Sequence, residues 1–183
     1  MNMTILVNVG LGEQAVSRDP QNVLVAYGLG SCLGIGMYDP GSKISGLLHA
    51  VLPDHMNNIG NTPGKFVDTG IPFLINEMTK AGADLRRMIV WMAGGASMIN
   101  SPGMTKAFDI GNRNIQAALK VFDTLNIRLS GQEVGGNTGR TVRIYVAEGR
   151  MTVRMVGLVE HDITMVRTEK YAVKGETGSC LKY

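Results

Sequence analysis

The chain has 183 residues, of which 44% are hydrophobic and 18% charged, and its formal net charge is +3. This composition is too apolar and too weakly charged for a disordered chain, and the length suits one globular domain. The sequence has no basic block or basic stripe with interleaved aromatics, so we expect no nucleic-acid partner. No apolar stretch is long enough to span a membrane, and the first residues do not form a signal peptide, so we expect no membrane insertion.

The cysteine content indicates a reducing compartment. Cys32 and Cys180 are the two cysteines, and neither a disulfide framework nor a CxxC or Cys/His cluster of zinc-ligand spacing is present. We therefore expect a cytoplasmic protein with reduced thiols and no metal site.

The first half of the sequence predicts strands followed by one helix. We expect strands at residues 4–9, 23–26, 33–38 and 44–52. The turn signal Asp39-Pro40-Gly41-Ser42 separates the last two strands, and residues 55–65 are polar enough to form a loop. The apolar positions Val67, Ile71, Leu74 and Met78 follow helical spacing. Since Pro72 is tolerated only in a first turn, we expect Thr69 to cap this helix, which ends at Gly82.

The second half predicts a further helix and more strands. Residues 88–93 form a buried strand, and Asp109 caps a helix. The buried face of this helix is expected to hold Asn114, Ala117, Ala118, Val121 and Leu125. Further strands are expected at residues 127–133, 142–146 and 151–155, the last two as a hairpin around Glu148-Gly149. Because about eight strands do not alternate strictly with two helices, we expect an α/β (α+β) sandwich: mixed β-sheets flanked by two main helices.

One short stretch, "GLGSCLG" at residues 28–34, carries chemistry-bearing residues. It fails the dinucleotide-binding pattern because Leu33 stands where the last glycine belongs, and no Walker lysine follows. Cys32 is therefore either a small core residue in a tight turn or a nucleophile, and a nucleophile needs a base.

His49 is the histidine that hairpin geometry can bring to Cys32. If residues 39–42 form a four-residue loop, Cys32 lies directly opposite His49 on the same face, with Cβ atoms roughly 4.5–5.5 Å apart. A loop differing by one residue would put the two on opposite faces. A histidine beside a cysteine lowers the thiol pKa and supplies a general acid and base. The alternative is a buried cysteine and a core histidine with no chemical role.

Glycines around Cys32 give the nucleophile hypothesis a further element. They would let a substrate carbonyl approach the backbone closely, and N–H groups around Gly30, Ser31 and Cys32 could then stabilise an oxyanion.

Several motifs in register resemble one family. "GLGSCLG", "YDP" and "GLLHAVLPD" are followed by "PGKFVDTGI", "AGGASM", "IGNRN" and "GGNTGRTV", over roughly residues 5 to 157. In this order they resemble CheD, the chemotaxis protein that deamidates chemoreceptor glutamines. The resemblance implies a single catalytic domain at residues 1–157. Residues 158–183 are polar and have no clear period, so we expect them to form a partly flexible C-terminal extension.

The resemblance also implies a fold and a mechanism. The family is similar in fold to the catalytic domain of cytotoxic necrotizing factor toxins. Cys32 matches its catalytic cysteine and His49 its catalytic histidine. Members convert receptor glutamines to glutamates without a cofactor, can hydrolyse glutamyl methyl esters, and often bind CheC, a phosphatase of phosphorylated CheY. The implied partners are thus the cytoplasmic helices of chemoreceptors and CheC.

The chain departs from some members at Ala26, where those have a threonine that orients the histidine. The third role would then pass to a backbone carbonyl, for which Ala26 itself is the candidate, or to another group. Ser97, Asn137 and Arg140 lie in glycine-rich segments and are candidate substrate contacts, with polar turn residues as the alternative.

Two rival functions use the same residues differently. A CheD-like chain could act as a non-catalytic or weakly catalytic adaptor that binds CheC or receptors. It could also be another thiol enzyme, such as a thioesterase or a cysteine protease. Thiol reactivity separates the first rival from the deamidase, and a substrate panel separates the second.

Overall fold

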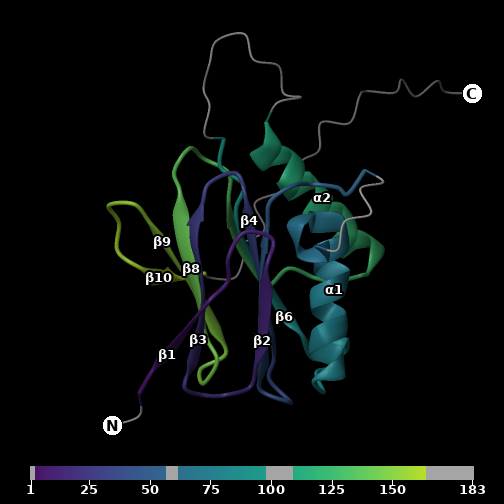
Figure 1. Ribbon diagram of the computed structural model, residues 1–183, viewed down its shortest axis with the longest axis vertical. Coiled ribbons are helices and arrows are strands. Elements are labelled where there is room, and N and C mark those ends of the chain that lie inside the picture. The colour runs from purple at the N-terminus through teal and green to yellow at the C-terminus, as the bar shows by residue number, and fades with distance from the viewer. Residues whose placement is uncertain (1–2, 57–61, 98–108, 164–183) are drawn as a thin grey trace, which may run out of the picture.

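The computed structural model describes residues 3–56, 62–97 and 109–163 as a three-layer arrangement of two sheets and a helical layer (Figure 1). One sheet has the order β1-β3-β8-β9-β10, and the other has the order β2-β5-β4-β6-β7. The strands of the first sheet are β1 (Ile5–Asn8), β3 (Asn22–Leu29), β8 (Arg140–Tyr145), β9 (Arg150–Met155) and β10 (His161–Asp162). Those of the second are β2 (Gln14–Ser17), β4 (Leu33–Asp39), β5 (Ile44–Ala50), β6 (Ile89–Gly94) and β7 (Gly131–Val134).

Two helices cover the outer face of the second sheet (Figure 1). These are α1 (Val67–Lys80) and α2 (Ile110–Thr124), and the short 3₁₀ segments η1 (Pro63–Lys65) and η2 (Leu85–Arg87) flank α1. Within the described residues, no helix is long and apolar enough to cross a membrane. The two sheets and the two helices beside them confirm the α+β sandwich expected from the sequence.

The alternation of side chains along β4 and β5 divides the interior into two cores. Ile35 and Met37 of β4 and Leu48 of β5 face the helices, while Leu47 of β5 and Tyr38 of β4 face the other sheet. The second sheet is therefore buried on both faces, which explains why every residue of β4 and β5 is buried.

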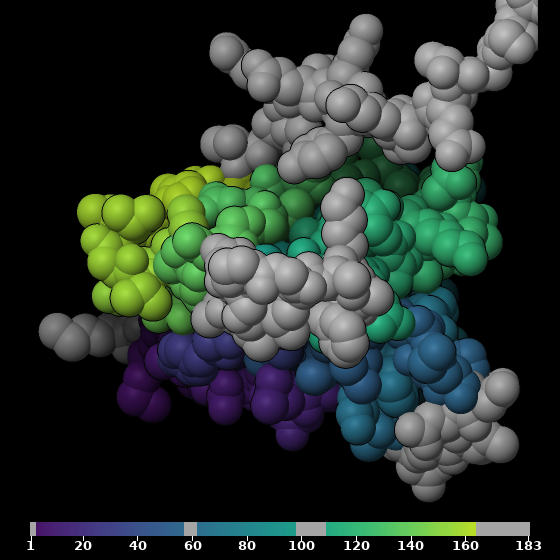
Figure 2. Space-filling view, turned by 90° about the horizontal axis from the view of Figure 1, so that it is seen from above, coloured from purple at the N-terminus to yellow at the C-terminus, as the bar shows by residue number. Residues whose placement is uncertain are grey.

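The site lies at one end of the sandwich. There the chain leaves β3 at Leu29, crosses from the first sheet to the second, and enters β4 at Leu33. β5, β6 and β7 end at the same edge, because β4 pairs antiparallel with β5 and β6, and β7 pairs parallel with β6. Figure 2 looks down on this end, with the yellow-green strands of the first sheet and the blue α1 region on opposite sides.

The first helix begins earlier than the sequence indicates. Phe66, not Thr69, is its N-cap, so Pro72 lies inside the helix rather than in its first turn. The Thr69 hydroxyl instead donates to the carbonyl of Pro63, 2.8 Å away, which ties α1 to η1. Asp109 caps α2 as expected, its side chain accepting from the Asn112 N–H at 3.1 Å. On α2, Leu125 is partly exposed and Phe122 takes the buried position expected for it.

Two strands escape sequence analysis, and one is shorter than expected. β2 pairs with β5, and β10 pairs with β9; both are short and lack a clear apolar alternation. β7 begins at Gly131 rather than at residue 127. The division of the chain at residue 157 stays a prediction. The structure does show that Ile163, beyond that point, is buried against the core between the sheets.

Candidate active site

Cys32 lies in the three-residue loop that carries the chain from one sheet to the other. Leu29 pairs with Arg140 in the first sheet, and Leu33 begins the ladders of the second. A register shift in β3 between Ala26 and Leu29 accompanies a left-handed Gly28 (φ 67°), so the strand ends in an irregular turn. The Cys32 side chain is half-buried and packs against the core between the sheets.

His49 occupies the penultimate position of β5, on the face that looks toward the first sheet. Its side chain is buried, with 2% exposed. Both backbone polar groups of His49 are hydrogen-bonded to the same segment. The His49 N–H donates to the Glu13 carbonyl at 3.0 Å, and the His49 carbonyl accepts from the Gly12 N–H at 2.9 Å. The segment that follows β1 therefore fixes the histidine in place.

The imidazole of His49 is oriented by a backbone carbonyl. Its Nδ1 lies 3.2 Å from the carbonyl oxygen of Val9. A carbonyl can only accept a hydrogen bond, so Nδ1 carries the proton and Nε2 of the neutral ring carries the lone pair. Nε2 is buried and has no hydrogen-bond partner within the described residues. An unpartnered basic nitrogen is the feature expected of a general base awaiting a proton donor.

The hairpin register differs by two residues from the one expected. Asp39 pairs with Ile44, so His49 lies opposite Gly34 rather than Cys32. Because the shift is even, Cys32 and His49 keep the same face. Cys32 lies just beyond the last paired residue of β4, so the ladder itself sets no distance between the two side chains. Cys32 packs against the core between the sheets, which is the side that His49 faces.

Electrostatics keep both groups neutral in the free protein. Burial raises the pKa of the Cys32 thiol above its usual value, an effect that the Cys32 amide partly offsets. Burial also lowers the pKa of His49, against the opposing effects of the Val9 carbonyl and the Glu13 charge. The thiol pKa therefore moves in the opposite direction to the one expected from a neighbouring histidine. A neutral thiol beside a neutral imidazole is suited to proton transfer during attack rather than to a standing ion pair.

Ala26 does not contribute the carbonyl that contacts the histidine. It is buried in β3, where it pairs with Val142 of β8. The ring contact goes to Val9, a residue that no sequence signal marked. The orienting contact is present even though the chain lacks a hydroxyl at position 26.

Backbone from the end of β6 cradles the Cys32 loop. The Gly95 N–H donates to the Cys32 carbonyl at 2.8 Å, and the Ala96 N–H donates to the Gly30 carbonyl at 2.8 Å. Gly94 has a φ of 110°, and a Cβ at this residue would lie 2.2 Å from the Cys32 carbonyl oxygen. Gly94 of "AGGASM" is thus required for the close approach of β6 to the Cys32 loop.

The backbone N–H groups of the Cys32 loop differ in whether they already donate a hydrogen bond to a backbone carbonyl. The Gly30 N–H donates to the Gly28 carbonyl at 2.9 Å. The N–H groups of Ser31 and Cys32 make no such bond to a backbone carbonyl in the described part of the chain. Ser31 and Cys32 are therefore better candidates than Gly30 for stabilising an oxyanion.

The three candidate substrate contacts are in different environments. Arg140 is buried, and its guanidinium donates to the carbonyls of Gly94 (3.1 Å) and Gly135 (2.7 Å), so it supports the glycine-rich turns rather than facing solvent. Asn137 is exposed and contacts its neighbour Thr138. A substrate contact by any of these residues stays a prediction.

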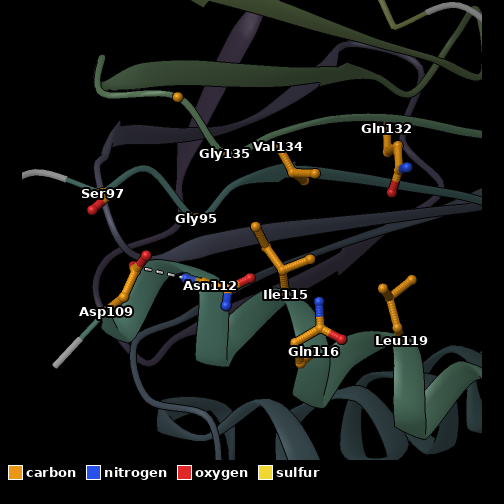
Figure 3. Close-up of a pocket in the computed structure, with 11 residues that line it drawn as sticks. Gly95, Ser97, Asp109, Asn112, Ile115, Gln116, Leu119, Gln132, Val134 and Gly135 are labelled. Carbon is orange, nitrogen blue, oxygen red and sulfur yellow. Dashed lines mark hydrogen bonds between the residues drawn. The ribbon is translucent and has the colours of Figure 1, made fainter. Parts of the chain in front are cut away.

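Ser97 lies at a separate pocket. It is one of the residues around a hollow of about 570 Å³ between α2 and the ends of β6 and β7. Figure 3 shows Ile115 and Leu119 of α2 reaching toward Val134 and Gln132 of β7 across this space. Neither Cys32 nor His49 lines it.

The two other histidines of the chain, His55 and His161, have local partners. His55 Nδ1 lies 2.7 Å from a carboxylate oxygen of Asp68 on α1, and His161 Nε2 lies 2.8 Å from Glu133 of β7. The bond with Glu133 raises the pKa of His161. Cys180 lies outside the described residues.

Comparison with known proteins identifies the family of the chain. Residues 51–155 match the family model CheD, described as CheD chemotactic sensory transduction. The family model covers more than half of the chain but begins just after His49. The chain belongs to the CheD family.

Curated relatives extend the match across the site. A protein of Symbiobacterium thermophilum named "Probable chemoreceptor glutamine deamidase CheD" is 41% identical over 157 residues, covering 85% of this chain and 95% of the relative. Since 85% coverage leaves 15% of the chain unmatched, and both Cys32 and His49 lie farther than that from either end, the match spans them. Proteins of the same name from Caldanaerobacter subterraneus subsp. tengcongensis (41% identical; 83% of this chain, 94% of the relative) and Desulforamulus reducens (39%; 82% and 91%) are similar.

Proposed function

We propose that this protein is a chemoreceptor glutamine deamidase that acts in the cytoplasm through Cys32 and His49. The observation that carries the proposal is Nε2 of His49, which has no hydrogen-bond partner among the described residues, while Nδ1 contacts the Val9 carbonyl. His49 lies on the face of β5 that looks toward the core between the sheets, against which Cys32 packs. The similarity to relatives named as chemoreceptor glutamine deamidases supplies the substrate class.

The reaction has two halves. As Nε2 of His49 takes the thiol proton, Sγ of Cys32 attacks the side-chain carbonyl of a receptor glutamine, and loop amides stabilise the oxyanion. The protonated imidazole then gives its proton to the leaving nitrogen, which departs as ammonia and leaves a thioester on Cys32. A water molecule, deprotonated by His49, attacks the thioester and releases glutamate and the thiol.

The same steps with methanol as the leaving group would hydrolyse a glutamyl methyl ester. No step in either reaction calls for a metal or an organic cofactor. CheC is a proposed partner on the strength of the family resemblance, and titration of the purified protein with CheC in a calorimeter tests that proposal directly.

Ammonia release from a chemoreceptor cytoplasmic fragment tests the deamidase. The wild-type protein is expected to release ammonia in an enzyme-dependent manner, and Cys32→Ala is expected to release none. His49→Ala should lose on the order of 10²–10⁴-fold in rate. Folded variants, checked by circular dichroism, that release ammonia at the wild-type rate would overturn the proposal. A folded wild-type protein that releases none would favour the adaptor function.

A further inference from the structure

Asn114 is a fully buried polar residue on α2 that contacts both halves of the Cys–His site. Its Nδ2 lies 2.8 Å from the carbonyl oxygen of Ser31 and 3.0 Å from that of Val51. Ser31 directly precedes Cys32, and Val51 follows His49 by two residues. Since both partners are carbonyl oxygens, which only accept, the orientation of the amide is fixed, and its two N–H groups serve one partner each.

The β ladder alone does not fix Cys32 relative to His49. The last paired positions of β4 and β5 are Leu33 and Ala50, so Cys32 lies just beyond the ladder. The bonds from Gly95 and Ala96 tie the loop to β6. The Asn114 side chain is the group that ties it to the strand of the histidine.

We propose that Asn114 is a positioning residue that holds the Cys32 loop at the reacting distance from His49. The inference rests on the proposed Cys–His chemistry. A primary amide of this length is the side chain that fits: serine has one donor, leucine none, and an ionised aspartate would repel both carbonyls. Replacement would leave two partly buried carbonyls without these donors and free the loop to move.

Close packing between α2 and the end of β6 fixes the position of the helix that carries Asn114. Gly111 and Gly95 let the first turn of α2 approach the end of β6, and a Cβ on Gly111 would lie 2.5 Å from the carbonyl oxygen of Ala96. This close packing sets the depth of α2, and Asn114 follows less than one turn later. The motif "IGNRN" therefore supplies both the contact glycine and the amide.

The hydrogen bonds of the Asn114 side chain in the described residues are the two that it donates. Oδ1 of Asn114 is buried and has no hydrogen-bond partner within the residues that the structure describes. The side chain is therefore connected to its surroundings through the Ser31 and Val51 carbonyls.

The test measures kcat and KM on a receptor fragment together with the reactivity of the Cys32 thiol. The variants are Asn114→Ser and the isosteric Asn114→Asp, each made in the wild-type chain and in a His49→Ala chain. Asn76→Ser changes an exposed asparagine in the middle of α1 and is the matched control. Iodoacetamide labelling near pH 7 is followed on the Cys32 peptide by mass spectrometry, which reports the Cys–His pair without any receptor.

We expect both Asn114 variants to lower kcat on the order of 10²-fold with little change in KM, because a small displacement of the nucleophile affects the chemical step. His49→Ala should slow labelling of Cys32, an Asn114 variant should slow it similarly, and the double variant should be no slower than His49→Ala alone. Asn76→Ser should match the wild type in all measurements.

Each other outcome has a distinct meaning. If Asn114 variants slow labelling equally with and without His49, or change the melting temperature but not kcat, the positioning role is overturned and the deamidase proposal stands. If His49→Ala leaves both labelling and turnover unchanged, the Cys–His pair itself is refuted and the role of Asn114 falls with it. Should Asn114→Asp fail to fold because its carboxylate repels both carbonyls, Asn114→Ser decides between these outcomes, and should Asn114→Ser fail, the labelling and turnover of Asn114→Asp decide.

Discussion

The imidazole Nδ1 of His49 lies 3.2 Å from the carbonyl oxygen of Val9, a residue 40 positions earlier in the chain. The Val9 N–H in turn donates to the Val25 carbonyl at 2.8 Å, so the first sheet holds the orienting carbonyl in place. A main-chain group thus performs the task that a side-chain hydroxyl could perform, and no substitution at residue 9 other than one that moves the backbone can remove it.

Replacing His49 by glutamine should separate orientation from base catalysis. The glutamine amide can still donate to the Val9 carbonyl, but it has no basic nitrogen to accept the thiol proton. We expect kcat on a receptor fragment to fall on the order of 10²–10⁴-fold with the fold retained. His55→Gln, at an exposed histidine bonded to Asp68, is the control and should keep its activity. Equal losses in the two variants would refute a specific role for His49.

The pH dependence of turnover should follow the lowered pKa of His49. Burial places this pKa below the usual value of about 6.5, so the ring is neutral and able to accept a proton at pH 7. As the pH falls through the pKa of His49, the ring becomes charged and kcat/KM should decline, with the midpoint below about 6.5. A kcat/KM profile measured from pH 4.5 to 9 checks this. A midpoint well above 6.5 would contradict the neutral pair.

A methyl group on Gly111 should destabilise the protein, although alanine normally favours a helix by about 1 kcal/mol over glycine. The added Cβ would lie 2.5 Å from the Ala96 carbonyl and 2.6 Å from the Gly95 carbonyl, so α2 must move outward. We expect Gly111→Ala to lower the free energy of unfolding by about 1–3 kcal/mol in urea titrations. Gly139→Ala has no atom within 4 Å of the new Cβ and should leave stability nearly unchanged. Stabilisation by Gly111→Ala would show that the close contact is not required.

Asp39 should control acid stability from the opposite end of the sandwich. Its buried carboxylate accepts hydrogen bonds from Arg87, Ser42, and the Gly41 and Asp84 amides, and the Arg87 bond above all lowers its pKa. Its stabilisation is therefore complete above about pH 4 and is lost as the pH falls below that value toward the folded-state pKa.

Asp39→Ala should accordingly cost about 2–3 kcal/mol at pH 7, since its partner Arg87 is half-exposed, and much less in strong acid. Unfolding free energies measured between pH 2 and 7 check this, and activity per folded molecule should be unaffected because the turn lies far from Cys32. A destabilisation that does not change with pH would rule out the ionised carboxylate as its source.

The sequence predicts much of the fold because local signals agree with tertiary packing. The turn at Asp39-Pro40, the helical face of α1 and the Asp109 cap each have a local cause, and each is found in the structure. The exact start of α1 differs because Phe66 takes the cap position through tertiary contacts. β2 and β10 are recognised only by their partners, since each is short and has no apolar alternation of its own.

The candidate site likewise has features that a local sequence signal predicts and features that depend on tertiary contacts. The face shared by Cys32 and His49 is predicted because it depends only on whether the hairpin loop has an even or an odd number of residues. The register itself depends on the left-handed Lys43 (φ 57°), which lets Asp39 pair with Ile44. The Val9 carbonyl has no sequence signal, whereas Asn114 had one: a polar residue on the buried face of α2.

The central claim is that Cys32 converts receptor glutamine to glutamate, and site-mapped mass spectrometry tests it most directly. A chemoreceptor cytoplasmic fragment from the same host would be incubated in ¹⁸O-labelled water with the wild-type protein or with Cys32→Ala. We expect conversion at defined glutamines, with one ¹⁸O atom per new glutamate, in the wild-type reaction alone. Conversion of the same glutamines by folded Cys32→Ala, or none by the folded wild-type protein, would contradict it.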